Sequence, residues 1–149
     1  MKQKAIIDSS ILVKIILEKD KKLLKYLYEN YEIFIPVNVL EETSFIIIRE
    51  SIKEIFNEER FYKMKEIFER EKIELIEKRL EILNELTNIW RVLEINKNIF
   101  EISKSIIKKY RLLPNDALVV ASAKYYNIDT LITRDGDFKK VDILKVILI

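Results

Sequence analysis

Short apolar runs alternate along the chain with stretches in which apolar residues recur at helical spacing. The run at residues 4–7 ends abruptly at Asp8, which is typical of a buried strand in a parallel sheet. Similar runs predict further strands, and the helical spacing predicts helices between them. The expected strands cover residues 4–8, 32–36, 92–95, 129–133 and 144–149, and the expected helices cover residues 9–19, 22–29, 38–55, 97–110 and 117–126.

This alternation of strands and helices predicts the fold class. It is typical of an α/β sandwich built on a parallel sheet. In folds of this kind, ligands bind beyond the carboxyl ends of the strands. The chain has 149 residues and no internal change of composition, so we expect a single domain over residues 1–149.

The stretch over residues 58–90 is long, charged and amphipathic. Its apolar positions recur at helical spacing, so we expect two helices or one bent helix there. Such a segment can be a solvated helix pair and nothing more. It can also be an arm that binds a second subunit or another partner, because a complete apolar stripe needs something to cover it.

The composition narrows the chemistry, because the chain contains no cysteine and no histidine. Disulfides, thiolate metal sites, cysteine nucleophiles, Ser-His-Asp triads and ordinary zinc sites are therefore excluded. No run is apolar enough for a signal peptide or a membrane span, so we expect a cytoplasmic protein. The net charge of +2 is too small to indicate nucleic-acid binding by itself.

Four acidic residues stand where such a fold places its ligands. Asp8 follows the first strand, and Glu41 lies in the first turn of the helix after the second strand. Asp135 comes two residues after the strand that ends at Thr133, and Asp116 opens an apolar helix. The carboxyl ends of parallel strands meet at one edge of a sheet, so we expect these acids to lie close together.

The four acids together indicate a site for divalent cations. A cluster made only of carboxylates repels itself unless a cation holds it together. Oxygen ligands favour Mg²⁺ or Mn²⁺ over Zn²⁺, and a pair of such ions can hydrolyse a phosphodiester. Each acid alone also suits a helix cap or a turn. Only the set as a whole therefore favours a nuclease.

Four segments resemble the motifs of PIN domains, in the same order and with similar spacing. The first is residues 5–12 (AIIDSSIL), a strand that ends at an acid, and the second is residues 35–41 (IPVNVLE), which lead to an acid in the next helix. The third and fourth are residues 113–123 (LPNDALVVASA) and 131–138 (LITRDGDF). The resemblance extends over nearly the whole chain, and the last two motifs together are its most specific part.

The resemblance implies a three-layer α/β/α, Rossmann-like fold with a parallel sheet of about five strands. It also implies an endoribonuclease that uses Mg²⁺ or Mn²⁺ to cleave single-stranded RNA. Many small members of the family are toxins of VapC-type toxin–antitoxin pairs, and most of these form homodimers. An antitoxin protein and a second copy of the chain are therefore expected partners.

The resemblance also assigns roles to individual residues. Glu41 would be the acid of the second motif, although its neighbour Glu42 is the alternative if the register differs by one. We prefer Glu41 because it lies five residues after Pro36 and completes a capping box with Asn38. The expected metal ligands are Asp8, Glu41, Asp116 and Asp135, with Asp137 in a secondary role, and the expected orienting hydroxyls are Ser9 and Thr133.

RNA contacts are expected from basic residues beside the acids. Arg134 flanks the fourth motif, and Lys14 lies on the first helix, two turns beyond Asp8. Both are candidates for holding phosphates. Charged runs are also commonly solvated helix faces, which is the alternative for these residues.

Two other functions fit parts of the pattern. A PIN-like fold without activity can bind protein or RNA, but the presence of all four acids is evidence against this. A receiver-type domain also binds Mg²⁺ with acids at strand ends and is phosphorylated on Asp. The chain lacks the acidic pair that such domains carry directly after the first strand.

Overall fold

Five parallel strands form one sheet in the computed structural model, which describes all 149 residues. The strand order is β3-β2-β1-β4-β5, so the first strand lies in the centre. All four neighbouring pairs are parallel. The strands are β1 (Gln3–Ile7), β2 (Tyr31–Pro36), β3 (Arg91–Leu93), β4 (Thr130–Thr133) and β5 (Lys145–Leu148).

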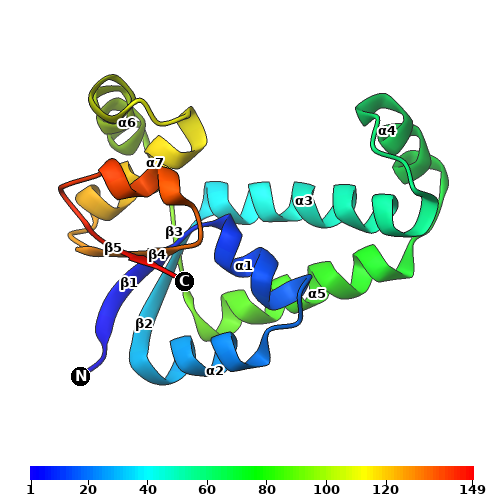
Figure 1. Cartoon of the computed structure of the whole chain (residues 1–149), viewed down its shortest axis with the longest axis horizontal. Coiled ribbons are helices and arrows are strands. Elements are labelled where there is room, and N and C mark those ends of the chain that lie inside the picture. Colours follow the sequence, from blue (N-terminus) through cyan, green and yellow to red (C-terminus); the bar gives the residue numbers. More distant parts are fainter.

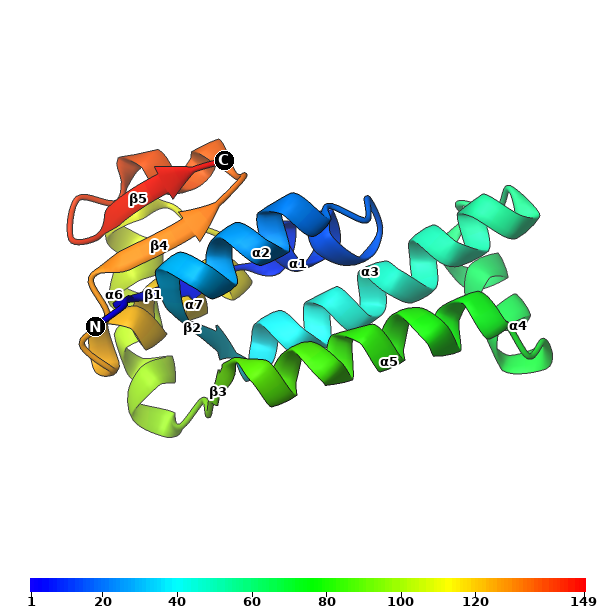
Figure 2. The same ribbon diagram turned by 90° about the horizontal axis from the view of Figure 1, so that it is seen from below.

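Helices cover both faces of the sheet and complete three layers (Figures 1 and 2). Two of them, α6 and α7, pack together on one face, and α1 and α2 lie on the other. The predicted α/β/α fold with a parallel five-stranded sheet is confirmed. The helices are α1 (Ser9–Ile16), α2 (Lys21–Asn30), α3 (Val37–Phe56), α4 (Phe61–Arg70), α5 (Glu74–Ile89), α6 (Lys97–Tyr110) and α7 (Pro114–Tyr125), and a short 3-10 helix, η1 (Gly136–Lys140), precedes β5.

The apolar run of β1 is the centre of the core. Ala5, Ile6 and Ile7 are fully buried, because strands flank them on both sides and helices cover both faces. Ile7 pairs with Ile132 of β4, so these two central strands end at the same level. The polar residues that follow them therefore meet at one edge of the sheet.

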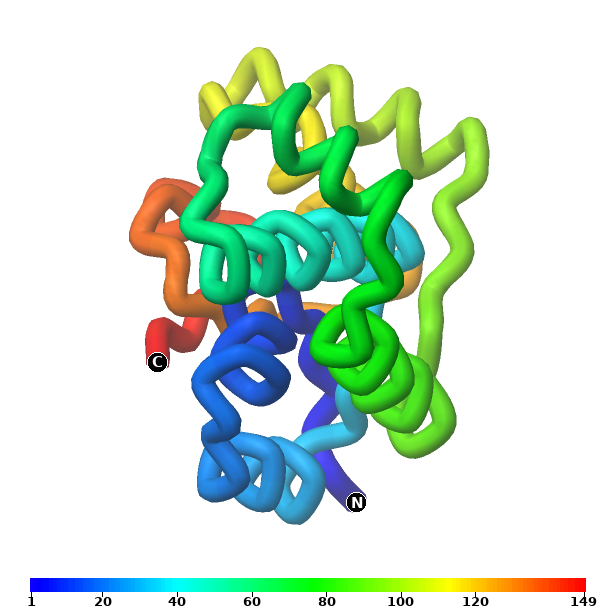
Figure 3. The backbone as a smooth tube through the Cα atoms, turned by 90° about the vertical axis from the view of Figure 1, so that its right-hand side faces the viewer, coloured from blue at the N-terminus to red at the C-terminus, as the bar shows by residue number.

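Residues 58–90 form, together with α3, an arm that extends away from the sheet. The arm consists of α3, α4 and α5: α3 and α5 pack side by side, and α4 lies across their far ends (Figures 1 and 3). The expectation of two helices in residues 58–90 is thus correct, with the break at residues 71–73. Arg79 of α5 is buried in the arm and donates hydrogen bonds to Ser51 Oγ (2.8 Å) and Glu54 Oε2 (2.9 Å) of α3.

Several helices end without glycine. Lys19, Asn57, Arg111 and Asn127 all have φ values of 54–56°, in the left-handed region that glycine usually occupies. The chain has a single glycine, so longer side chains must adopt this conformation where the backbone turns.

Two local predictions need correction. Asn38 was expected to cap the helix after β2, but α3 already begins at Val37 with Pro36 as its N-cap. The strand expected over residues 92–95 is shorter and begins earlier, at Arg91. No helix has both the length and the apolar character needed to span a membrane.

Candidate active site

Asp8 is the centre of the site. It follows β1 directly and is only 5% exposed. Two hydroxyl groups fix its carboxylate: Ser10 Oγ donates to Oδ1 (2.6 Å) and Thr133 Oγ1 donates to Oδ2 (2.9 Å). Thr133 is the last residue of β4 and Ser10 lies in α1. The Asp8 side chain therefore connects the end of β1 with the end of β4 and the start of α1.

The segment after β4 is held against the same group. Asp135 N donates to Thr133 Oγ1 (2.9 Å), and Arg134 N donates to Ser10 Oγ (2.9 Å). The Asp135 carboxylate in turn accepts a hydrogen bond from Asp137 N (2.9 Å) and so caps η1. Backbone and hydroxyl groups therefore set the position of the fourth motif relative to Asp8.

Burial and neighbouring carboxylates make Asp8 hard to ionise. Burial is the largest influence and raises the pKa of Asp8 from 3.8 to about 6. This value includes the opposing effect of the hydrogen bonds from Ser10 and Thr133, which lower the pKa, and the smaller effect of the negative charges of Asp135 and Glu42, which raise it. The carboxylate is thus oriented by its neighbours but lacks a compensating positive charge.

Asp116 reaches the same edge from α7. Leu113 is the N-cap of that helix and Pro114 stands in its first turn, which places Asp116 in the first turn as well. Burial raises the pKa of Asp116 to about 6, and the charges of Asp135, Glu42, Asp8 and Asp137 add to the effect. The start of α7 is joined to the start of α3, because Asn38 Nδ2 donates to Asn115 O (3.1 Å) and Oδ1 (2.9 Å).

Of the two adjacent acids in α3, the structure brings Glu42, the alternative to the preferred Glu41, near the other acids. Glu42 is half-buried and raises the pKa of both Asp8 and Asp116. Glu41 is exposed and is not among the charges that shift either pKa. The expected capping box depended on Asn38 as the N-cap, but the helix begins earlier. One residue corresponds to a rotation of about 100° around the helix axis, so the neighbouring acid faces the site.

The hydroxyl groups also differ from the expectation in one position. Thr133 contacts Asp8, but the hydroxyl from the first motif belongs to Ser10, and Ser9 makes no side-chain hydrogen bond to the acid. Ser10 is therefore a functional candidate that sequence reasoning missed. The adjacent serine pair after Asp8 was the available signal, but only the direction of α1 decides between them.

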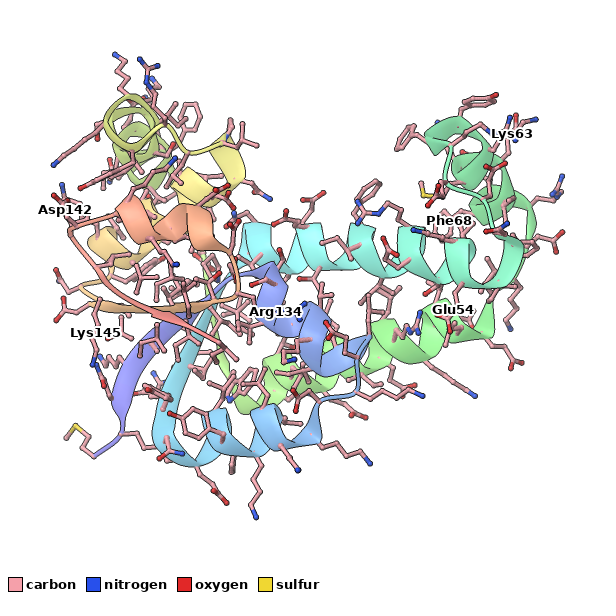
Figure 4. All side chains as sticks on the ribbon, viewed as in Figure 1. Glu54, Lys63, Phe68, Arg134, Asp142 and Lys145 are labelled. Carbon is pink, nitrogen blue, oxygen red and sulfur yellow. The ribbon has the colours of Figure 1, made fainter.

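The two basic residues expected to contact RNA lie beside the site and have acidic partners. Arg134 Nη2 is 2.7 Å from Glu18 Oε2, and Lys14 Nζ lies 3.8 Å from Glu18 Oε1 and 3.4 Å from Asp20 Oδ2. In Figure 4 the labelled Arg134 lies against α1. Neither cation forms an ion pair with the acids of the site.

The acids as a group have no internal counter-charge. None of the ion pairs in the structure includes Asp8, Glu42, Asp116, Asp135 or Asp137. No three of these carboxylates stand close enough together to form a ready-made metal-binding group. The chemistry of the donor set nevertheless fits a hard divalent cation, because all the donors are carboxylate oxygens without a positive partner, and the charges of the other acids act on Asp8 and Asp116.

Comparison with known proteins identifies the family. The model of the PIN domain matches residues 5–144 of the chain. The chain belongs to the PIN-domain family. This PIN domain is 38% identical to Ribonuclease VapC2 of Methanocaldococcus jannaschii over 148 residues, which are 97% of this chain and 93% of the relative. The resemblance seen in the four sequence motifs is thereby confirmed.

Solved structures share the fold of this PIN domain. VapBC2 from Rickettsia felis, bound to a DNA fragment from its promoter, matches with a TM-score of 0.67 and 17% identity over 99% of each chain. A toxin–antitoxin complex from Klebsiella pneumoniae matches with a TM-score of 0.65 and 17% identity over 96% of this chain and 95% of the other.

Proposed function

We propose that this PIN domain is a metal-dependent endoribonuclease that cleaves single-stranded RNA. The observation that carries the proposal is the group of five carboxylates without a positive partner at the carboxyl edge of the sheet, with Asp8 at its centre. The ribonuclease name of the relative from Methanocaldococcus jannaschii supports the same reaction class.

The acids of the site are proposed to hold the metal. Asp8, Glu42, Asp116 and Asp135 would bind Mg²⁺ or Mn²⁺, and Asp137 would act from the outer part of the site. The bound cation would activate water and stabilise the leaving oxygen of the phosphodiester. Ser10 and Thr133 orient the Asp8 carboxylate, and their hydrogen bonds restrict it to one rotamer.

A groove beside the acids offers a path for the RNA. It has a volume of about 640 Å³ and lies between α1, α3 and α5. Ser9 and Ser10 form the end of the groove next to Asp8, while Val13, Leu17 and Ile46 supply apolar lining. Its position beside Asp8 suits a single strand, because a base can pack against the apolar side chains while the backbone phosphate lies near the acidic edge, where a cation would bind it.

The proposal also includes an antitoxin partner, a second copy of the chain and a location in the cytoplasm. Toxin–antitoxin complexes among the structures with this fold support an antitoxin partner, and the cytoplasm is the place where such a pair would meet RNA. A homodimer is supported by exposed apolar side chains on the arm, which a second copy would cover. These side chains are Phe45, Ile55, Phe56, Phe61 and Phe68.

The test is cleavage of a labelled single-stranded RNA with Mg²⁺, with Mn²⁺ and with EDTA. We expect cleavage that requires the metal and is lost in Asp8→Asn. Asp129→Asn is the matched control. It also replaces an aspartate by asparagine, but Asp129 is exposed and lies at the opposite end of β4. Metal-independent cleavage, or full activity of Asp8→Asn, would refute the proposal.

A further inference from the structure

Arg134 is the positive group closest in sequence to the acids, yet its side chain is directed away from them. Its backbone lies between Thr133 and Asp135, and its N–H is bonded to Ser10 Oγ at 2.9 Å. The side chain lies beside α1 (Figure 4), and Nη2 is 2.7 Å from Oε2 of Glu18, which follows that helix. The side chain is 30% exposed, so it stands at the surface of the site and remains accessible to a ligand.

Glu18 is placed to receive this guanidinium. It follows α1, and its side chain is 48% exposed in the wall of the groove that contains Ser9 and Ser10. Lys14 lies on its other side, 3.8 Å away. Lys14 is itself held by Asp20, whose carboxylate also caps α2 through Leu23 N (2.9 Å). The row of alternating charges therefore ends at Arg134, which has no acidic partner except Glu18.

The chemistry of the pair allows exchange with RNA. A guanidinium binds carboxylates and phosphates through the same planar fork of N–H donors. A half-exposed ion pair is weak, since water and salt screen both charges. A phosphate that enters the groove can therefore replace Glu18 on Arg134 at little cost.

We propose that Glu18 is a positioning residue that occupies, on Arg134, the place of an RNA phosphate. It holds the guanidinium beside the groove until the substrate backbone displaces it. This inference rests on the proposed ribonuclease function. It makes Arg134 the phosphate contact and Glu18 the residue that limits RNA affinity, while Lys14 belongs to the fixed ion-pair network with Asp20.

The experiment measures the Kd of a short fluorescent single-stranded RNA in EDTA by anisotropy, and KM and kcat for its cleavage with Mn²⁺. The proteins are wild type, Glu18→Gln, Arg134→Gln and the double variant. Glu29→Gln is the control, because this acid forms an exposed pair with Lys25 on α2, outside the groove. Glu18→Asp retains the negative charge and should therefore behave more like wild type than Glu18→Gln does. Thermal unfolding of each variant shows whether a change in Kd or KM comes from a folding defect.

We expect Glu18→Gln to lower Kd and KM by about two- to five-fold with kcat unchanged, because it releases one weakly paired cation. The salt dependence of binding should steepen by about 0.7 in the slope of log K against log salt, which is one additional phosphate contact. Arg134→Gln should raise Kd, and Glu18→Gln should add nothing in that background. Glu29→Gln should leave every value unchanged.

Three results would overturn the inference. They are an unchanged or raised Kd in Glu18→Gln, an equal gain in affinity in the Arg134→Gln background, and an equal gain in the Glu29→Gln control. If wild type binds and cleaves RNA and one of these results is obtained, only this inference fails. If wild type neither binds nor cleaves RNA, the proposed function fails, and the inference fails with it.

Discussion

The acidic edge of the sheet and the helical arm shift the pKa values of their carboxylates in opposite directions. At the edge, burial raises the pKa of Asp8 to about 6. In the arm, hydrogen bonds from the Arg60 side chain and backbone lower the pKa of Glu58 to about 2. Glu58 has a positive partner in its own segment, whereas Asp8 has only hydroxyl donors and other acids around it.

The same contrast holds for the other charged residues of the two regions. In the arm, Arg79 pairs with Glu54 (2.9 Å) and Lys53 pairs with Glu59 (2.7 Å). At the edge, no acid has a basic partner, although Arg134 stands next to Asp135 in the sequence. The matched charges of the arm stabilise the structure, whereas the unmatched acids of the edge are available for a cation. The predictions below test this distinction.

The largest expected effect concerns stability without metal. The pKa of Asp8 is higher in the folded protein than in the unfolded chain, so folding favours the protonated acid. The stabilisation is complete below pH 3.8 and is lost as the pH rises through about 6. For a shift of this size, the loss is on the order of 3 kcal/mol. Denaturant unfolding in EDTA should show a decline that is larger by about this amount in wild type than in Asp8→Asn, which retains the contribution of Asp116.

The difference between the two proteins isolates the contribution of Asp8 from those of the other acids. Mn²⁺ should restore stability to wild type at neutral pH, because a ligand that binds only the folded state stabilises it. Parallel pH profiles for wild type and Asp8→Asn would show that ionisation of Asp8 does not destabilise the folded protein.

The second prediction separates the adjacent acids of α3. Glu42 faces the site and Glu41 faces solvent. Loss of a group that only orients a metal ligand costs about 10- to 100-fold, so loss of a direct ligand should cost at least about 100-fold. We therefore expect Glu42→Gln to reduce kcat/KM by at least about 100-fold and Glu41→Gln to leave it within about two-fold. The reverse ranking would restore the register inferred from the sequence.

The third prediction concerns the arm, where a change should affect stability and leave the chemistry intact. Arg79→Met removes the donor to Ser51 Oγ, which is fully buried, and should cost about 1–3 kcal/mol of unfolding free energy. Glu54→Gln is the matched control and should cost less than about 1 kcal/mol, because Glu54 is 59% exposed. At a temperature where both variants are folded, kcat should match wild type, while KM can change because both side chains line the groove. A large loss of kcat would mean that the arm takes part in the reaction.

The sequence was sufficient for the layers of the fold and for most of the acidic edge. The apolar run before Asp8 predicts a central strand, and β1 is that strand. The helix predicted over residues 97–110 is α6, and Asn96 caps it by accepting a hydrogen bond from Ile99 N. These features are local, so they can be deduced from a few neighbouring residues.

Other features could not be predicted from the sequence. They depend on contacts between distant segments, or the residue that usually marks them is absent. Helix ends are normally marked by glycine, but here Asn57 and Arg111 take the left-handed conformation in its place. The choice of Glu42 depends on where α3 begins, and that depends on how Pro36 leaves the sheet. The ion pair of Arg134 with Glu18 could not be predicted either. Glu18 is more than one hundred residues away in the chain, and the two side chains come into contact only in the folded protein.

The most direct test of the central claim is a calorimetric titration of Mn²⁺ into wild type, Asp8→Asn and Asp129→Asn. The account predicts saturable binding to wild type and to Asp129→Asn, with release of protons at pH 6, since Asp8 and Asp116 are partly protonated there. Asp8→Asn should bind Mn²⁺ weakly or not at all. If wild type shows no Mn²⁺ binding, or if Asp8→Asn binds as tightly as wild type, the acidic edge is not a metal site and the proposed reaction is contradicted.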